Sequence, residues 1–120
     1  MSPGIAHTQG EIADRISILE LKRAHGLLAP ELMIFQAAYR GRAQDLERLR
    51  EINACAWPVV ERIHGYFAGP VLPADARIPS VIEDCRAAHQ LNRLRVAVKN
   101  AINAQFNEAR EEKTWKPTTT

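Results

Sequence analysis

The chain has 120 residues, of which 16 are Lys or Arg and 14 are Asp or Glu, so its formal net charge at pH 7 is +2. This length fits one domain with a modest core, and so small a net charge does not by itself indicate a nucleic-acid or membrane partner. Hydrophobic residues make up 46% of the chain and aromatic residues only 6%, which favours helices packed through aliphatic side chains.

The first predicted helix covers residues 9–28. Thr8, with Glu11 three residues later, has the spacing of a capping box, and Pro30 sets the end because the residue before a proline avoids the α region. A surface helix needs one apolar stripe, but this one has two, so we expect it to be covered on both sides. One stripe holds Ile12, Ile16 and Leu19, and the opposite face holds Glu11, Asp14, Ile18, Leu21, His25 and Leu28.

The second predicted helix covers residues 31–66, and Pro30 suits its first turn. Gly41 weakens this helix without necessarily breaking it, and Pro58 should kink or divide it. Apolar residues with the spacing of one buried face are Leu32, Phe35, Ala38 or Tyr39, Leu46, Leu49 and Ile52.

Residues 69–79 contain three prolines and a glycine, which predict a loop. A long third helix then covers residues 80–113, with Ser80 as its N-cap. We expect its core stripe, together with Ile12, Ile16 and Leu19 of the first helix, to form the core. The core stripe of this third helix consists of Leu91, Leu94, Val98 and Ile102.

Nothing in the sequence is typical of a strand, so the predicted fold class is all-α. We expect an antiparallel bundle of three principal helices that forms a single domain over residues 1–113, followed by a loose C-terminal tail over residues 114–120. Three such helices leave apolar surface uncovered, which favours a homo-oligomer, in the simplest case a dimer.

The lack of a recognisable targeting signal and the two isolated cysteines both lead us to expect a cytoplasmic protein. No run of about 18 apolar residues predicts a transmembrane helix, and residues 1–10 lack the basic and apolar regions of a signal peptide. Two isolated cysteines, Cys55 and Cys85, fit that compartment and are expected to be buried thiols.

Residues 10–22, GEIADRISILELK, closely resemble the opening motif of an uncharacterised family of small helical bacterial proteins. The motif of that family is G-E-hydrophobic-x-D-[KR]-hydrophobic-[ST]-I-L-E-hydrophobic-K. Its members are associated with lipopolysaccharide or other biosynthetic genes and with phages, and some are fused to other domains. Three later segments are also similar to the family, in the same order: Ile52-Asn53 with Trp57; Asn92, Arg95, Lys99, Ile102 and Asn103; and residues 111–115.

The resemblance implies a helical fold but no particular activity. The chain departs from the family pattern at Val60 and Arg93, where acidic residues are expected, and at His89, where a tyrosine is expected. A site shared by the family would therefore carry a different charge in this chain.

The third predicted helix also has a basic and amide face beside its core stripe. This face is a natural partner for Glu11 and Asp14, since carboxylates are rarely buried without one. The residues of the face are Asn92, Arg95, Lys99, Asn103, Phe106 and Arg110.

Two interpretations of these charges are open. In the first, ion pairs between the helices fix the register of the bundle. In the second, the charges enclose a polar cavity in which Arg95 and Lys99 bind a carboxylate or phosphate, helped by Asn92 and Asn103. Glu11 or Asp14 would then be the catalytic proton acceptor if burial raised its pKa.

Other chemistry has less support in the sequence. Glu61 and His64 form one half of a di-iron motif that has no second copy, and Cys85 with His89 supplies only two metal ligands. There is no P-loop, Gly-x-Ser-x-Gly or dinucleotide-binding turn, so we expect no metal and no cofactor. The basic residues of the third helix lack an aromatic platform, so we do not expect nucleic-acid binding.

Two functions follow. The first is a polar inter-helix site that binds or processes a small anionic metabolite in a biosynthetic pathway. The second is a non-catalytic helical interaction module that docks on a biosynthetic enzyme or phage component. A cavity around Glu11, Asp14, Arg95 and Lys99 would favour the first, whereas paired charges with an exposed apolar patch would favour the second.

Overall fold

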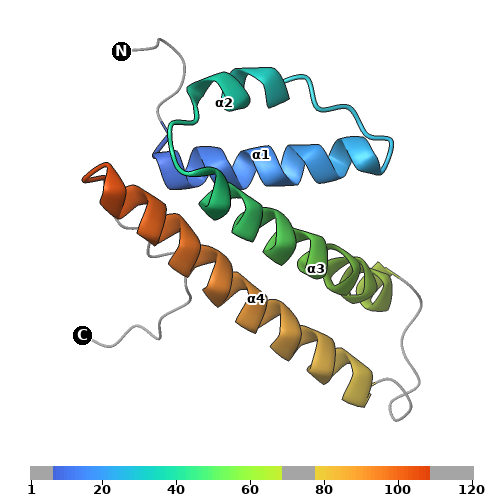
Figure 1. Ribbon diagram of the computed structural model, residues 1–120. Helices are drawn as coiled ribbons and strands as arrows, with labels where there is room; N and C mark the ends of the chain where they lie inside the picture. Colours follow the sequence, from blue (N-terminus) through green and yellow to red (C-terminus); the bar gives the residue numbers. More distant parts are fainter. Residues whose placement is uncertain (1–6, 69–77, 109–120) are drawn as a thin grey trace.

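A computed structural model describes residues 7–68 and 78–108. These residues form four helices and no strand, which confirms the all-α class (Figure 1). The helices are α1 (Gln9–Ala24), α2 (Leu32–Ala38), α3 (Ala43–Ala68) and α4 (Ile78–Gln105). No helix in the described part of the chain has the length and hydropathy needed to cross a membrane.

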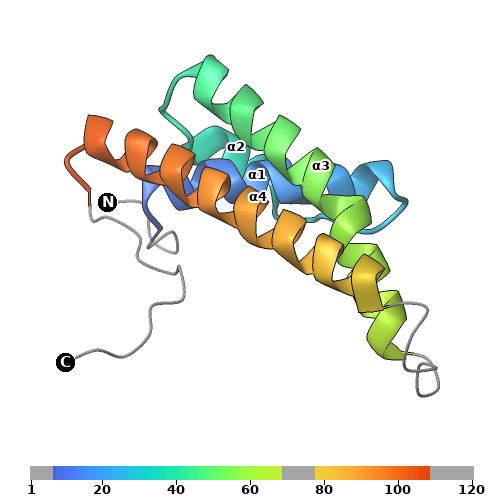
Figure 2. The same cartoon turned by 90° about the horizontal axis from the view of Figure 1, so that it is seen from below.

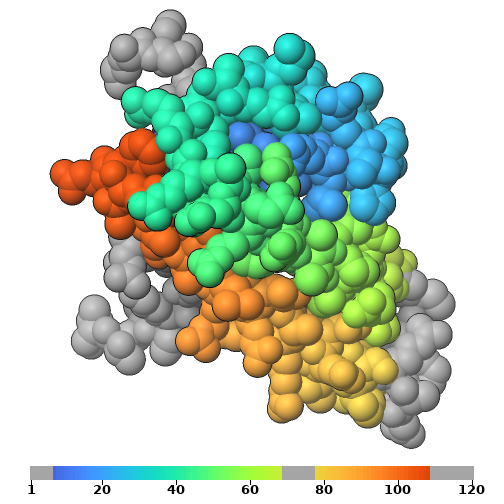
Figure 3. All heavy atoms as spheres, in the orientation of Figure 1, coloured from blue at the N-terminus to red at the C-terminus, as the bar shows by residue number. Residues whose placement is uncertain are grey.

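The long helices α3 and α4 lie side by side and run in opposite directions, and α1 crosses both of them (Figures 1 and 2). α2 packs against α1, on the side of α1 away from α4. The space-filling view shows α3 in contact with α4 along a continuous seam, with α2 and the connection to α3 above it (Figure 3). Three helices therefore surround α1.

α1 begins as predicted but ends earlier. The hydroxyl of Thr8 accepts a hydrogen bond from the backbone N–H of Glu11 at 3.2 Å, so the predicted cap is confirmed. The predicted end at residue 28 is wrong, because Gly26 adopts φ 79°, which favours glycine. The N–H of Leu27 then donates to the carbonyl of Lys22 at 2.8 Å and closes the helix. Leu28 lies beyond this turn and is 91% exposed.

The single helix predicted over residues 31–66 is in fact two helices, α2 and α3. The break lies at Tyr39, whose backbone is extended and whose hydroxyl donates to the carbonyl of Arg42 at 2.7 Å. A Cβ at Gly41 would collide with the ring and hydroxyl of Tyr39, so glycine lets the phenol close this turn. Pro58, in contrast, lies inside α3 and does not divide it.

α4 also differs from its predicted limits. Ser80 lies within the helix rather than at its cap. The helix ends at Gln105 because Asn107 adopts φ 55°, and the N–H of Glu108 donates to the carbonyl of Asn103 at 2.9 Å. This is a left-handed termination, so the predicted end at residue 113 is wrong. The predicted tail over residues 114–120 lies outside the described residues.

The core consists of two small clusters. In the first, Ile12 and Ile16 of α1 pack against Leu32 and Phe35 of α2. The second joins α1, α3 and α4 through Ala13, Leu49 and Ile102.

The predicted core is confirmed for Ile12, Ile16 and Ile102, all of which are buried. Leu94, however, is 54% exposed. α4 is rotated about its axis relative to the prediction, because its buried face passes through Val96 and Lys99. The other predicted core residues, Leu19, Leu91 and Val98, are half-buried.

Cys55 and Cys85 are free thiols, but both are exposed, contrary to the prediction. Cys55 follows the buried Asn53 by two positions in α3, and Cys85 follows the buried Asp84 by one position in α4. Helical spacing therefore places each cysteine off the buried face of its helix. Arg62 and Tyr66 of α3 hydrogen-bond to the carboxylate of Asp84, which links α3 to α4.

Candidate functional site

Asp14 is the centre of a polar cluster at the place where α1, α3 and α4 meet. Its carboxylate oxygen Oδ1 accepts a hydrogen bond from Asn53 Nδ2 at 3.0 Å. The other oxygen, Oδ2, lies 3.6 Å from Arg95 Nη1 and 3.8 Å from Lys99 Nζ. The predicted meeting of the acidic face of α1 with the basic face of α4 is thus confirmed for Asp14.

Hydrogen bonds among the neighbours of Asp14 close the network. The amide of Asn53 also donates to the hydroxyl of Ser17, and that hydroxyl donates to the backbone carbonyl of Asp14 at 2.7 Å. Asp14, Ser17, Asn53 and Lys99 are all buried. A buried charge is tolerated when it is paired and hydrogen-bonded, and this cluster meets both conditions.

Asn53 and Ser17 were not predicted from the sequence as site residues. Asn53 follows Leu49 by four positions, so it lies on the buried stripe of α3, where a polar residue needs a partner. Ser17 follows Asp14 by three positions on the contact face of α1. These two spacings were the available signals.

Glu11 lies at the edge of the cluster and has a different partner. Its Oε2 is 2.8 Å from His7 Nδ1. Burial raises the pKa of Glu11, but the hydrogen bond with His7 and the positive charges of His7, Arg15 and Lys99 outweigh burial, so the pKa lies below its ordinary value of 4.5. The raised pKa that a catalytic proton acceptor requires is therefore absent at Glu11.

The two asparagines predicted to bind a ligand have partners within the protein. Asn92 Oδ1 accepts a hydrogen bond from Arg95 Nη2 at 2.8 Å. Asn103 Oδ1 accepts one from the backbone N–H of Gly10 at 2.7 Å. This second bond brings the start of α1 against α4, and a Cβ on Gly10 would collide with the carbonyl of Lys99. Asn103 therefore positions the two helices.

A cleft of about 330 Å³ lies between α1 and α4, and Asp14 forms part of its wall. Four of its lining side chains are basic and two are acidic, so its charge favours an anion. Lys99 and Arg95 are held by Asp14, whereas Arg15 and Lys22 are further out on α1. The lining residues are Glu11, Asp14, Arg15, Ile18, Leu19, Lys22, Arg95 and Lys99.

A second cleft, of about 310 Å³, lies between α1 and α3 and is mainly apolar. The indole of Trp57 in its wall is stacked on the imidazole of His25, with ring centroids 4.3 Å apart. The lining residues are Ile18, Leu21, Asn53, Ala56, Trp57, Val60, Glu61, His64 and Arg95.

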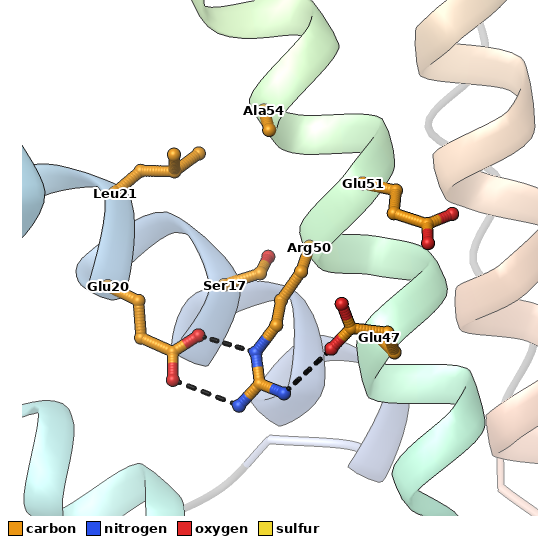
Figure 4. A pocket seen from close by; sticks show the side chains of 7 residues that line it. All are labelled: Ser17, Glu20, Leu21, Glu47, Arg50, Glu51 and Ala54. Atoms are coloured by element: carbon orange, nitrogen blue, oxygen red, sulfur yellow. Dashed lines mark hydrogen bonds and ion pairs between the residues drawn. The ribbon is translucent and has the colours of Figure 1, made fainter.

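A third cleft, of about 320 Å³, also lies between α1 and α3, and the basic residue in its wall is neutralised by glutamates (Figure 4). Arg50 of α3 donates to both carboxylate oxygens of Glu20 at 2.7 and 3.0 Å, and to Glu47 at 3.1 Å. The hydrogen bond with Glu20 is the main reason why the pKa of Arg50 is raised. Three glutamates and one arginine line this cleft, so it does not favour an anion.

No family model, curated protein or solved structure matches this chain. The resemblance to a family of small bacterial proteins stays a prediction. In the described part of the chain, no three His, Cys, Asp or Glu side chains come together as a metal site.

Proposed function

We propose that this protein binds a small anionic molecule, a carboxylate or phosphate, in the cleft between α1 and α4. The observation that carries the proposal is the surplus of basic side chains around this cleft. Asp14 neutralises only part of this charge and holds Arg95 and Lys99 in place. Cations held in position by the protein lose little conformational freedom when an anion arrives.

The lining residues would have different tasks in this proposal. Arg95 offers a planar guanidinium that suits a carboxylate or phosphate, and Lys99 offers a point charge. Arg15 and Lys22 would attract the anion toward the cleft. Asp14 and Glu11 are assigned positioning and electrostatic tasks rather than proton transfer. In keeping with the family resemblance, the anion would be a metabolite of a biosynthetic pathway.

A calorimetric titration with inorganic phosphate at low ionic strength tests this proposal. Lys22→Met removes a positive charge from the cleft and should weaken binding about two- to fivefold, the effect of one partly exposed charge. Arg93→Met is the matched control, because Arg93 is an exposed residue of α4 outside the cleft. Equal losses in the two variants would mean that phosphate responds only to net charge.

A second candidate function, an interaction module, is favoured by one observation. Large apolar side chains are exposed along α2 and the connection before it, and Leu28 and Met33 are the most exposed of them. Such a surface is typical of a contact with another protein. The exposed residues are Leu27, Leu28, Met33 and Ile34.

In this alternative, the surface docks on a biosynthetic enzyme, on a phage component or on a second copy of the chain. Self-association is the simplest version to test, by sedimentation at increasing protein concentration. The double variant Leu28→Glu and Met33→Lys should sediment as a smaller species than the wild type. Identical monomeric sedimentation of both proteins would refute self-association.

A further inference from the structure

Among the described residues, two buried side-chain N–H groups have no hydrogen-bond acceptor, and both belong to residues that line the apolar cleft between α1 and α3. They are Nε1 of Trp57 and Nε of Arg95. A buried donor without an acceptor is destabilising, so such groups are rare in folded proteins. Protein atoms cover both nitrogens, so an acceptor on a ligand can reach them only if the surrounding side chains move.

The rest of this cleft suits a flat apolar group. Apolar side chains from α1 and α3 form most of its wall, including Ile18, Leu21 and Val60. Its volume of about 310 Å³ is within the range of small-molecule sites. The stacking of His25 on Trp57 holds the indole ring in one orientation. The cleft thus has an apolar lining and a positioned aromatic wall.

The apolar cleft is next to the anion cleft. Ile18 and Arg95 line both of them. Arg95 uses Nη1 and Nη2 toward Asp14 and Asn92, and its Nε stays without an acceptor. One molecule can therefore place an anionic group at Arg95 and an apolar group against Trp57.

We infer that the apolar cleft receives the ring of a ring-bearing carboxylate whose carboxylate group lies at Arg95. This inference rests on the proposed function and narrows its ligand from anions in general to this class. The carboxylate supplies acceptor oxygens for the guanidinium of Arg95, and the ring supplies the apolar surface that Ile18, Leu21 and Val60 bury. A carboxylate without a ring would leave this cleft empty.

The test is a titration of the ¹⁵N-labelled full chain with benzoate, acetate, benzyl alcohol and inorganic phosphate, followed by NMR. The chain has two tryptophans, and Trp57→Phe identifies the indole N–H signal of Trp57. Benzoate should shift this signal, because its ring packs against the indole of Trp57 in the wall of the cleft. It should also bind at least about tenfold more tightly than acetate, because a phenyl ring is buried.

Val60→Phe is designed to fill the apolar cleft. Val60 is 39% exposed, so the larger ring should be tolerated. The variant should remove the advantage of benzoate over acetate while the affinity for phosphate is unchanged. The wild-type comparison of benzoate with acetate needs no variant, so the inference remains testable if Val60→Phe does not fold.

The outcomes separate this inference from the proposed function. If phosphate binds but benzoate binds no better than acetate, or leaves the Trp57 signal in place, the inference is overturned and the anion site stands. If benzyl alcohol binds as well as benzoate, the carboxylate has no role and the inference is again overturned. If neither phosphate nor benzoate binds, both proposals fail.

Discussion

Gly10→Ala tests the contact on which the position of the site depends. The backbone N–H of Gly10 donates to Asn103 Oδ1 at 2.7 Å, so α1 touches α4 at its first turn. A Cβ at residue 10 would lie 2.7 Å from that same oxygen and still closer to the backbone carbonyl of Lys99. The carbonyl belongs to a helix and cannot turn aside as a side chain can, so the helices must separate.

The expected loss of stability combines three effects. Overpacking of a buried site costs about 1–3 kcal/mol, and disruption of the bond to Asn103 costs about 1 kcal/mol. Alanine has a higher helix propensity than glycine by up to about 1 kcal/mol, which offsets part of this loss. We therefore expect Gly10→Ala to lower the free energy of unfolding by about 1–3 kcal/mol.

Urea denaturation followed by circular dichroism measures this loss, and Gly65→Ala is the matched control. Gly65 also lies in a helix, but a Cβ there meets nothing within 4 Å, so alanine should stabilise α3 by about 0.5–1 kcal/mol. The two substitutions should thus have opposite signs. If Gly10→Ala is as stable as the wild type while Gly65→Ala behaves as expected, α1 and α4 do not approach as described.

Three further predictions concern individual side chains. Lys99→Met should lower the free energy of unfolding by less than the roughly 3–5 kcal/mol expected for a fully unpaired buried charge, because Arg95 still faces Asp14. In urea denaturation, adding Asp14→Asn to Lys99→Met should restore part of this loss. If the effects of the two substitutions simply add, the two side chains are not coupled. Burial and the nearby negative charge of Asp45 raise the pKa of Tyr39 to about 12. The neutral phenol of Tyr39 therefore contributes its full stabilisation below the ordinary pKa of 10.0, and this stabilisation is lost as the pH rises toward about 12. An ultraviolet titration should show a late phenol ionisation that Tyr39→Phe removes. Ionisation of both tyrosines at the ordinary pH would contradict this prediction. Leu94→Ala should change stability by only about 0.5 kcal/mol, because Leu94 is exposed, and a cavity-sized loss would mean that α4 is turned the other way.

The sequence predicts the helical regions of this protein better than their ends. Apolar periodicity identifies each region, because burial of one face is what stabilises a helix. The ends depend on single residues with positive φ, such as Gly26 and Asn107. The break near Gly41 depends on the packing of the Tyr39 ring over the glycine, a contact that a local pattern does not contain.

The candidate site was predictable in part for the same reason. Helical spacing places Asp14, Arg95 and Lys99 on faces that meet, and their mutual need for a partner predicts the pairing. The close approach at Gly10, a residue without a side chain, brings the Lys99 and Asn103 face of α4 against α1. For this reason the sequence did not predict that Leu94 is exposed. The role of Asn53 depends on the packing of α3 against α1, which the spacing of residues in one helix does not predict.

The packing of α2 has a consequence for the order in which the molecule opens. This helix has only seven residues, too few to persist in water without tertiary support, and it packs against α1. Leu32 and Phe35 are its two buried side chains. The amide protons of α2 should therefore exchange with solvent when this helix detaches locally, well before those of α3 and α4. Each detachment uncovers the face of α1 that holds Ile12 and Ile16. The Asp14 network on the other face of α1 stays closed.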